Sequence, residues 1–336
     1  MARNPGFVLT HGAWRRNLTA VSAALLLCTI VQPVFGQKEN ADVVITSFDW
    51  PVGLQAQVMH QRIQIRESGD ERDSTANGVK YRMLVERHPA GRLISYDEFS
   101  VDGAQSMTDQ AALIDRLGAI SPRLVVSDYG ELVDVKDLDQ VSQAARTLLQ
   151  PMLDSMPAEA AGITAMLDQM LSKEFLMSKA AEEWGSLVGV WLETEFELGA
   201  VYELAVDESI PLFPDRIVPF LYQFRLSKWT ECRRGEALAK CVVLEMTSFP
   251  DPETMTALLD EMVGDAVTEL VPGGVRYRDW KIENHVRLVA EPSGLIPHHL
   301  QVTQAVTGSV DAGREGVASF AQIRTRTWDY RYAPFR

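Results

Sequence analysis

Alternating hydrophobic and polar residues dominate the first part of the chain and predict antiparallel β-strands. Residues 54–66 predict a strand with a bulge near Met59, because the apolar positions change parity there. Residues 68–78 are polar and predict a solvated loop. Residues 79–101 alternate on both sides of a Pro-x-Gly turn, and residues 124–135 repeat the pattern on a smaller scale, so each segment predicts a hairpin.

The hydrophobic period becomes helical in the middle of the chain. Residues 106–118 begin with a capping serine and predict a short helix. Residues 137–156 and 163–175 predict two longer helices, and Pro151 is expected to kink or divide the first. A methionine stripe on these helices can line a pocket for varied apolar ligands, and a plain helix-on-sheet core is the alternative. The candidate ligand-binding methionines are Met152, Met156, Met166 and Met170.

Strand patterns return in the C-terminal part of the chain. Residues 190–198 and 200–206 predict strands, residues 251–264 predict a helix, and residues 280–332 predict three long strands. Strand–turn–strand units built on Pro-x-Gly occur in both parts of the chain. They indicate either a duplicated unit or only the good turn-forming property of this motif.

Residues 220–249 contain two strand-like runs around a charged loop bounded by Cys232 and Cys241. The even-numbered residues are apolar on both runs, so the runs pair through these faces only if opposed residue numbers have an even sum. Placing Cys232 directly opposite Cys241 would need an odd sum. A disulfide between them therefore predicts a bulge or irregular turn between Trp229 and Cys241, with the disulfide outside the regular pairing.

The N-terminus has the pattern of a secretory signal peptide. Arg15 and Arg16 precede an apolar run that ends at Gly36, so we expect cleavage near Gly36 and a secreted or periplasmic mature chain. A retained N-terminal anchor is the alternative. Cleavage would leave Cys232 and Cys241 as an even pair in an oxidising compartment, which favours a disulfide. A metal or redox pair is the competing interpretation, but the two cysteines are not spaced for it.

The charge of the chain restricts its partners. Acidic residues outnumber basic ones by 46 to 32, which gives a net charge of −14. Loss of residues 1–36 removes three arginines and no acidic residue, so the mature chain carries −17. Because contacts to phosphate need lysine and arginine, this balance excludes nucleic acid as an expected partner.

Motifs for catalysis, metal binding or cofactor binding are not found in the sequence. The histidines lack a ligand spacing such as H-E-x-x-H, and Ser186 is wrongly placed for a G-x-S-x-G nucleophile elbow. We therefore expect no enzyme, metal or cofactor, and an uncharacterised hydrolase is one alternative. His298 shares the inward parity of Ile296 and Leu300, which makes it either a pocket residue or a hydrogen-bonded histidine at a sheet edge.

The last strand places arginine and aromatic residues on one parity. Such a face can meet an acidic or aromatic partner, for example an envelope protein. Cross-strand packing against acidic neighbours is the alternative. The candidate partner-binding residues are Arg324, Arg326, Trp328 and Tyr330.

Together the patterns predict an α+β fold, with long antiparallel strands in one or two curved sheets and the Met-rich helices packed on one face. In outline this resembles the half-barrels of periplasmic lipoprotein carriers, although no motif supports that family. We expect a signal peptide (1–36), an N-terminal β-rich half (37–136), a helical connector (137–183) and a C-terminal β-rich half with the disulfide hairpin (184–336).

Two functions are compatible with these expectations. The first is non-catalytic binding of an apolar or amphipathic, lipid-like molecule between the sheet and the helices. The second is an envelope scaffold, or protein-interaction module, that uses the last strand.

Overall fold

The computed structural model describes residues 43–101, 122–154, 168–210, 213–233, 239–258, 276–311 and 317–332. The predicted signal peptide and the predicted helix over residues 106–118 lie outside these residues. Met156 and Met166 also lie outside them. Within the described part of the chain, no helix has the length and apolar character that a membrane crossing requires.

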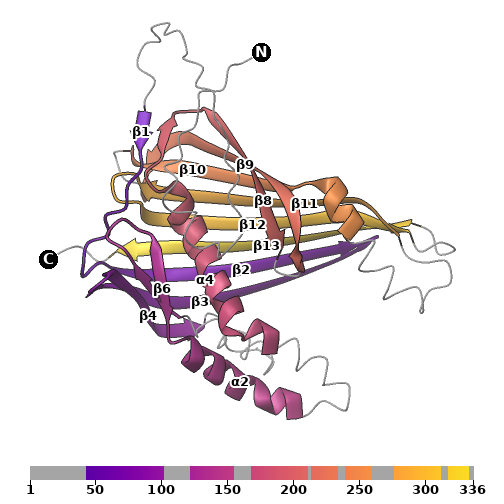
Figure 1. Ribbon diagram of the computed structural model, residues 1–336, viewed down its shortest axis with the longest axis horizontal. Helices are drawn as coiled ribbons and strands as arrows, with labels where there is room; N and C mark the ends of the chain where they lie inside the picture. Colours follow the sequence, from indigo (N-terminus) through magenta and orange to yellow (C-terminus); the bar gives the residue numbers. More distant parts are fainter. Residues whose placement is uncertain are drawn as a thin grey trace, which may run out of the picture.

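One antiparallel sheet of eleven strands forms the body of the protein (Figure 1). The sheet is open, with β6 and β8 at its edges, and the order is β6-β5-β4-β3-β2-β13-β12-β11-β10-β9-β8. This confirms the prediction of a mainly antiparallel β-structure. The strands are β2 (Gln55–Ser68), β3 (Glu71–His88), β4 (Gly91–Val101), β5 (Arg123–Val126), β6 (Leu132–Lys136), β8 (Val201–Ile210), β9 (Phe213–Glu231), β10 (Ala239–Pro250), β11 (Arg276–Glu291), β12 (Ile296–Asp311) and β13 (Val317–Tyr332).

The remaining elements are short or helical. Strands β1 (Val43–Ile45) and β7 (Glu195–Glu197) pair in a small separate sheet. The helices are α2 (Leu138–Asp154), α4 (Lys173–Leu187) and the 3₁₀-helix η1 (Gly189–Trp191). Figure 1 shows α4 lying across one face of the large sheet. We call this the inner face.

The hydrophobic core lies between the inner face and α4. Ser172 caps the helix, because its side chain accepts a hydrogen bond from the Phe175 backbone amide. Trp184 of α4 and Trp50 are almost fully buried, and their indole nitrogens donate to the Gly130 and Leu295 carbonyls at 2.8 and 3.0 Å. Burying two large aromatic residues with satisfied N–H groups fixes α4 against the sheet.

Both predicted hairpins of the first part are present. β3 turns into β4 through Pro89 and Ala90, and β5 turns into β6. Gly91 follows the first turn with a φ of +132°, and a Cβ at this position would lie 2.4 Å from the Val126 carbonyl oxygen. Only glycine therefore allows β4 to begin so close to β5.

Two predictions for this part are wrong. β2 pairs with β3 and β13 without a register shift, so the bulge near Met59 does not exist. The apolar residues change parity because the second half of β2 leaves the core, where Ile63 is 42% exposed. Most of the segment 68–78, predicted as a loop, belongs to β3, which begins at Glu71. Backbone pairing with β2 holds this polar segment extended although the side chains of residues 71–76 are exposed.

Further differences concern the middle of the chain. The second predicted helix was expected to end near residue 175, whereas α4 begins at Lys173 and runs to Leu187. The strand predicted over residues 190–198 is also wrong, because this segment forms η1 and the three-residue β7. The strand predicted over residues 200–206 is confirmed as part of β8. The helix predicted over residues 251–264 is confirmed where it is described, at residues 252–258.

The hairpin of β9 and β10 confirms the parity argument. Even-numbered residues oppose one another along most of the ladder, for example Phe224 and Met246. Register shifts occur between Ala239 and Cys241 and between Val243 and Leu244. Only the first shift lies in the predicted segment between Trp229 and Cys241. Cys241 pairs with Thr230 within the ladder and Cys232 lies beyond the end of β9, so the expected position of the disulfide outside the pairing holds for Cys232 alone.

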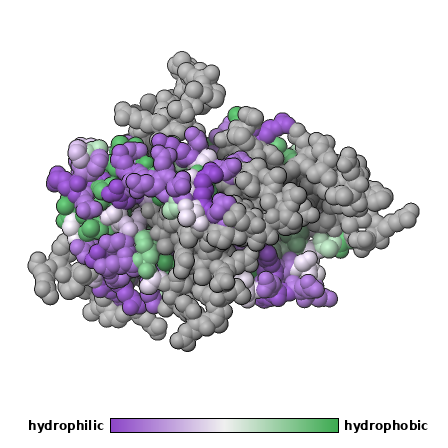
Figure 2. Space-filling view, turned by 90° about the horizontal axis from the view of Figure 1, so that it is seen from below, coloured by the Kyte–Doolittle hydropathy of each residue, from purple (hydrophilic) through white to green (hydrophobic). Residues whose placement is uncertain are grey.

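The two parts of the chain share the large sheet, because β2 hydrogen-bonds to β13 along its whole length. The proposed division into two β-rich halves and a helical connector stays a prediction. Seen from below, the described surface is largely hydrophilic with separate hydrophobic patches (Figure 2).

Candidate functional site

A cavity of about 270 Å³ lies between α4 and the inner face. Its helical wall combines apolar and polar residues of α4: Leu176, Lys179, Ala180, Glu183, Trp184, Ser186 and Leu187. Its floor comes from β2, β3, β4, β12 and β13, which become neighbours only in the folded sheet. The floor is rich in aromatic side chains: His60, Tyr81, Tyr96, Trp328 and Tyr330.

The aromatic residues of the floor pack closely against one another. His60 stacks on Trp328 with ring centroids 4.5 Å apart and an interplanar angle of 1°. Tyr81 and Tyr96 meet edge to face at 5.5 Å. Burial raises the pKa of the Tyr81, Tyr96 and Tyr330 hydroxyls, so these groups are neutral. The floor therefore offers an uncharged aromatic surface.

His60 is a neutral polar group within this floor. Desolvation, together with the nearby positive charges of Arg326 and Arg62, lowers its pKa to about 4. Its Nε2 atom is buried and has no hydrogen-bond partner among the described residues. An unsatisfied polar atom in an aromatic cavity can accept or donate a hydrogen bond to a bound molecule.

Ion pairs between β13 and α4 lie at one side of the cavity. Arg326 of β13 contacts Glu183 and Glu182 of α4 at 3.3 and 3.6 Å, and its guanidinium lies 5.6 Å from the centre of the Trp328 ring. Desolvation raises the pKa of the Glu183 carboxyl. Because 55% of the side chain is exposed, contact with water limits this rise. These contacts tether α4 to the sheet at the cavity rim.

The candidate methionines are not placed in this cavity by the described residues. Met170 is 44% exposed and does not line the cavity. Met152 lies in α2, but the environment of its side chain is outside the described part. A ligand-binding role for the methionines stays a prediction.

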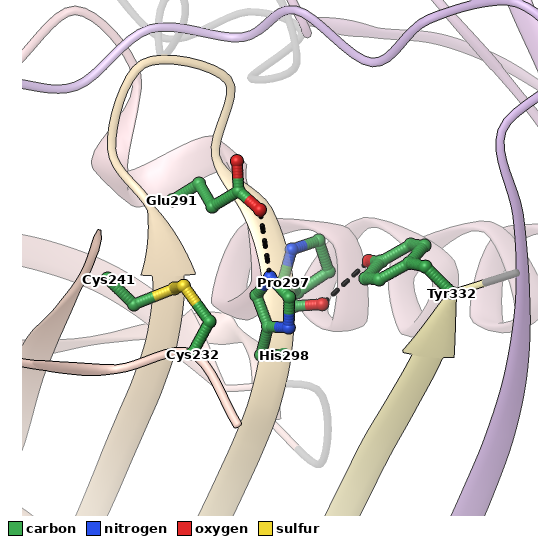
Figure 3. Close-up of a disulfide and its surroundings, with 6 residues drawn as sticks. All are labelled: Cys232, Cys241, Glu291, Pro297, His298 and Tyr332. Atoms are coloured by element: carbon green, nitrogen blue, oxygen red, sulfur yellow. Dashed lines mark hydrogen bonds and ion pairs between the residues drawn. A yellow bond between two sulfur atoms is a disulfide. The ribbon is translucent and has the colours of Figure 1, made fainter. Parts of the chain in front are cut away.

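His298 lies beside the disulfide rather than in the cavity lining (Figure 3). It occupies a register shift between β11 and β12, where Val289 opposes His299 and Ala290 opposes Pro297. Its Nε2 atom is 3.1 Å from a Glu291 carboxylate oxygen. Its Nδ1 atom is buried and has no hydrogen-bond partner among the described residues, and a pocket role for His298 stays a prediction.

The same region brings together potential metal ligands. One ligand atom each from Cys232, Cys241 and His298 lies within 4.8 Å of the others. Both sulfur atoms are joined in the disulfide, so neither is a thiolate available to a metal.

The candidate partner-binding residues lie on the inner face. Trp328 and Tyr330 are only 7% and 6% exposed and form part of the cavity floor. Arg326 is at the rim, and Arg324 is exposed beyond it. A partner could reach the two aromatic residues only by entering the space under α4, and a protein partner for this face stays a prediction.

Sequence reasoning missed most of the cavity. His60 and Tyr81 follow the inward parity of their strands, so their orientation could have been inferred from Val58 and Met83. The pairing of β2 with β13, which brings His60 to Trp328, has no local sequence signal.

Comparisons with known proteins add a structural likeness. No protein-family model and no curated protein sequence matches the chain. A solved structure titled "Lipid-protein interactions in lipovitellin" is similar to it, with a TM-score of 0.40 and 10% sequence identity. The match covers 86% of this chain and 26% of the other, so the chain spans about a quarter of that structure. A likeness of this strength carries no argument about function.

Proposed function

We propose that the protein is an exported, non-catalytic binding protein that holds the apolar part of a small amphipathic molecule between α4 and the inner face. The supporting observation is the aromatic cavity, whose 270 Å³ volume is close to the lower end of the ~300–1,000 Å³ range of small-molecule sites. Apolar walls with a few polar groups are typical of such sites.

The protonation states of His60 and the buried tyrosines favour binding over catalysis by these groups. General acids and bases work best with a pKa near the working pH. The pKa of His60 is lowered to about 4 and the tyrosine pKa values are raised, so these groups hold their protonation states near neutral pH. Ser186 also lines the cavity, but its hydroxyl donates to the Glu182 carbonyl at 3.1 Å instead of to a base.

Export is supported by the N-terminal pattern together with the disulfide. Disulfides persist in oxidising compartments, which for a chain with a signal-peptide pattern means the periplasm or the exterior.

Filling the cavity tests the binding function. In Ala180→Phe, the added ring projects from the helical wall, and the affinity for the neutral fluorescent probe N-phenyl-1-naphthylamine should fall at least ~10-fold, because a residue of this size removes the space for the probe. Ala181→Phe is the matched control, because Ala181 is the next residue of α4 and does not line the cavity.

The measurement is probe fluorescence against protein concentration, with circular dichroism confirming that each variant is folded. The proposal predicts strong binding to the wild type and to Ala181→Phe. A folded Ala180→Phe protein with wild-type affinity, or a wild type that does not bind the probe, would contradict it.

A further inference from the structure

An arginine row runs along the inner face beside the cavity. We define it as Arg62 of β2 with Arg324 and Arg326 of β13. Arg62 and Arg326 are directly opposite each other in the ladder, and Arg324 is two residues farther along β13 on the same face. The row is unexpected in a chain whose net charge is −14.

The cross-strand neighbours of the row are uncharged, apart from the arginines themselves. Arg62 faces Asn77 on β3, and Arg326 faces Val302 on β12. Arg324 lies between Gln64 and Gln304 on its two neighbouring strands. By contrast, Arg66, the next arginine on this face of β2, faces Asp73.

Of the three arginines in the row, only Arg326 has its positive charge balanced by carboxylates of the described residues. Arg326 pairs with Glu182 and Glu183, whereas no described carboxylate forms an ion pair with Arg62 or Arg324. Arg324 lies against the neutral amide of Gln322, at 3.0 and 3.1 Å once that amide is oriented to accept. Arg62 and Arg324 thus keep an unbalanced positive charge at the surface, where their guanidinium groups can donate hydrogen bonds.

Like charges placed directly opposite each other on a sheet destabilise it. The effect is visible in Arg62, whose pKa is lowered by desolvation and by the charges of Arg324 and Arg326. An anion bound across the row would remove this repulsion and would use guanidinium groups that match carboxylate and phosphate oxygens.

The row continues the cavity floor along one strand. Tyr330, Trp328, Arg326 and Arg324 follow one another on the inner face of β13, at steps of ~7 Å for two residues. A molecule whose apolar part lies over Trp328 therefore places its other end at Arg326 and Arg324.

We propose that the ligand of the cavity is a single-chain amphiphile with an anionic carboxylate or phosphate headgroup, which the arginine row binds. This inference rests on the proposed function, because the apolar part of the same molecule occupies the cavity.

The test compares amphiphiles that share a chain and differ in headgroup. Decanoate, decyl phosphate and 1-decanol displace N-phenyl-1-naphthylamine from the wild type, and both anions should bind at least ~10-fold more tightly than the alcohol, as expected for charge-assisted hydrogen bonds. In Arg62→Gln/Arg324→Gln this preference should disappear while the affinity for 1-decanol stays unchanged. Arg331→Gln is the matched control, because Arg331 is exposed on the opposite face of β13.

The outcomes separate the two proposals. Equal affinity for anions and alcohol, or a preference that persists in the double variant, overturns the headgroup site and leaves the cavity proposal intact. Failure of all three molecules to bind overturns the cavity itself. Inorganic phosphate is the fourth probe, and affinity for it equal to that for decyl phosphate would identify a free-anion site and overturn the amphiphile assignment.

Discussion

The protonation state of His60 on β2 depends on residues of β13, which is far from β2 in the sequence. Desolvation by burial, together with the charges of Arg326 and Arg62, holds it neutral and lowers its pKa from the ordinary 6.5 to about 4, and β13 also supplies Trp328, on which its ring stacks. Between these values the unfolded chain binds more protons than the folded protein. The contribution of His60 to stability is therefore complete above pH 6.5 and is lost as the pH falls toward 4.

We expect His60→Gln to reduce the pH dependence of stability. The shift corresponds to about 3 kcal/mol of unfolding free energy lost by the wild type between pH 6.5 and 4. Urea unfolding at several pH values measures it. Glu183 and Glu208 have raised pKa values, so protonating them at low pH favours the folded state, which is the opposite of the effect of His60. Both glutamates are present in both proteins, so the difference in pH dependence between the proteins reports His60. Equal pH dependence in both would contradict a neutral buried His60.

Strand parity predicted which side chains share a face of the sheet. Parity placed Arg324, Arg326, Trp328 and Tyr330 on one face, and the structure keeps them together there. Parity does not say which face α4 covers, so the burial of Trp328 and Tyr330 could not be foreseen. His298 is buried, as its parity indicated, but it lies at a register shift beside Glu291 and the disulfide and does not line the cavity.

Among the elements, the β9–β10 hairpin followed most directly from the sequence. Pairing of the apolar faces needs an even sum of opposed residue numbers, whereas Cys232 opposite Cys241 gives an odd sum, so the ladder had to be irregular. Helix α4 was harder to predict from the sequence. Leu176, Ala180 and Trp184 recur every four residues, but this stripe is narrow, and Trp184 was assigned to the start of the strand-rich part.

The disulfide should stabilise this hairpin measurably. Replacing both cysteines in Cys232→Ala/Cys241→Ala is expected to lower the unfolding free energy by about 3 kcal/mol, because the loop of the unfolded chain is no longer closed. Urea unfolding measures the change. Reductant should destabilise the wild type to a similar degree and leave the double variant unaffected, and a wild type insensitive to reductant while unfolding would count against this account.

For the whole molecule, the mainly antiparallel β-structure was predictable and the strand order was not. Alternation predicts strands one at a time, whereas the junction of β2 and β13 joins residues such as Arg62 and Arg326 that are far apart in the sequence. The polar start of β3 is a similar case, because only its pairing with β2 makes it a strand.

Removing β13 should therefore disrupt the entire sheet. A chain ending at residue 316 would leave β2 and β12 with unpaired edges in the middle of the sheet and would lose the floor residues Trp328 and Tyr330. We expect this chain to aggregate in size-exclusion chromatography, whereas a chain ending at Tyr332 should elute as the full-length protein does. A soluble, folded chain without β13 would show that the junction is dispensable.

Under the proposed binding function, the junction of β2 and β13 also determines when a ligand can be acquired. In a chain that is exported unfolded with its N-terminus first, β2 crosses before its second neighbour and stays without it until β13 has crossed. The cavity floor does not exist before that moment, because Trp328 and Tyr330 belong to β13. Such a protein cannot carry cargo out of the cytoplasm, and it must load from the compartment in which it folds.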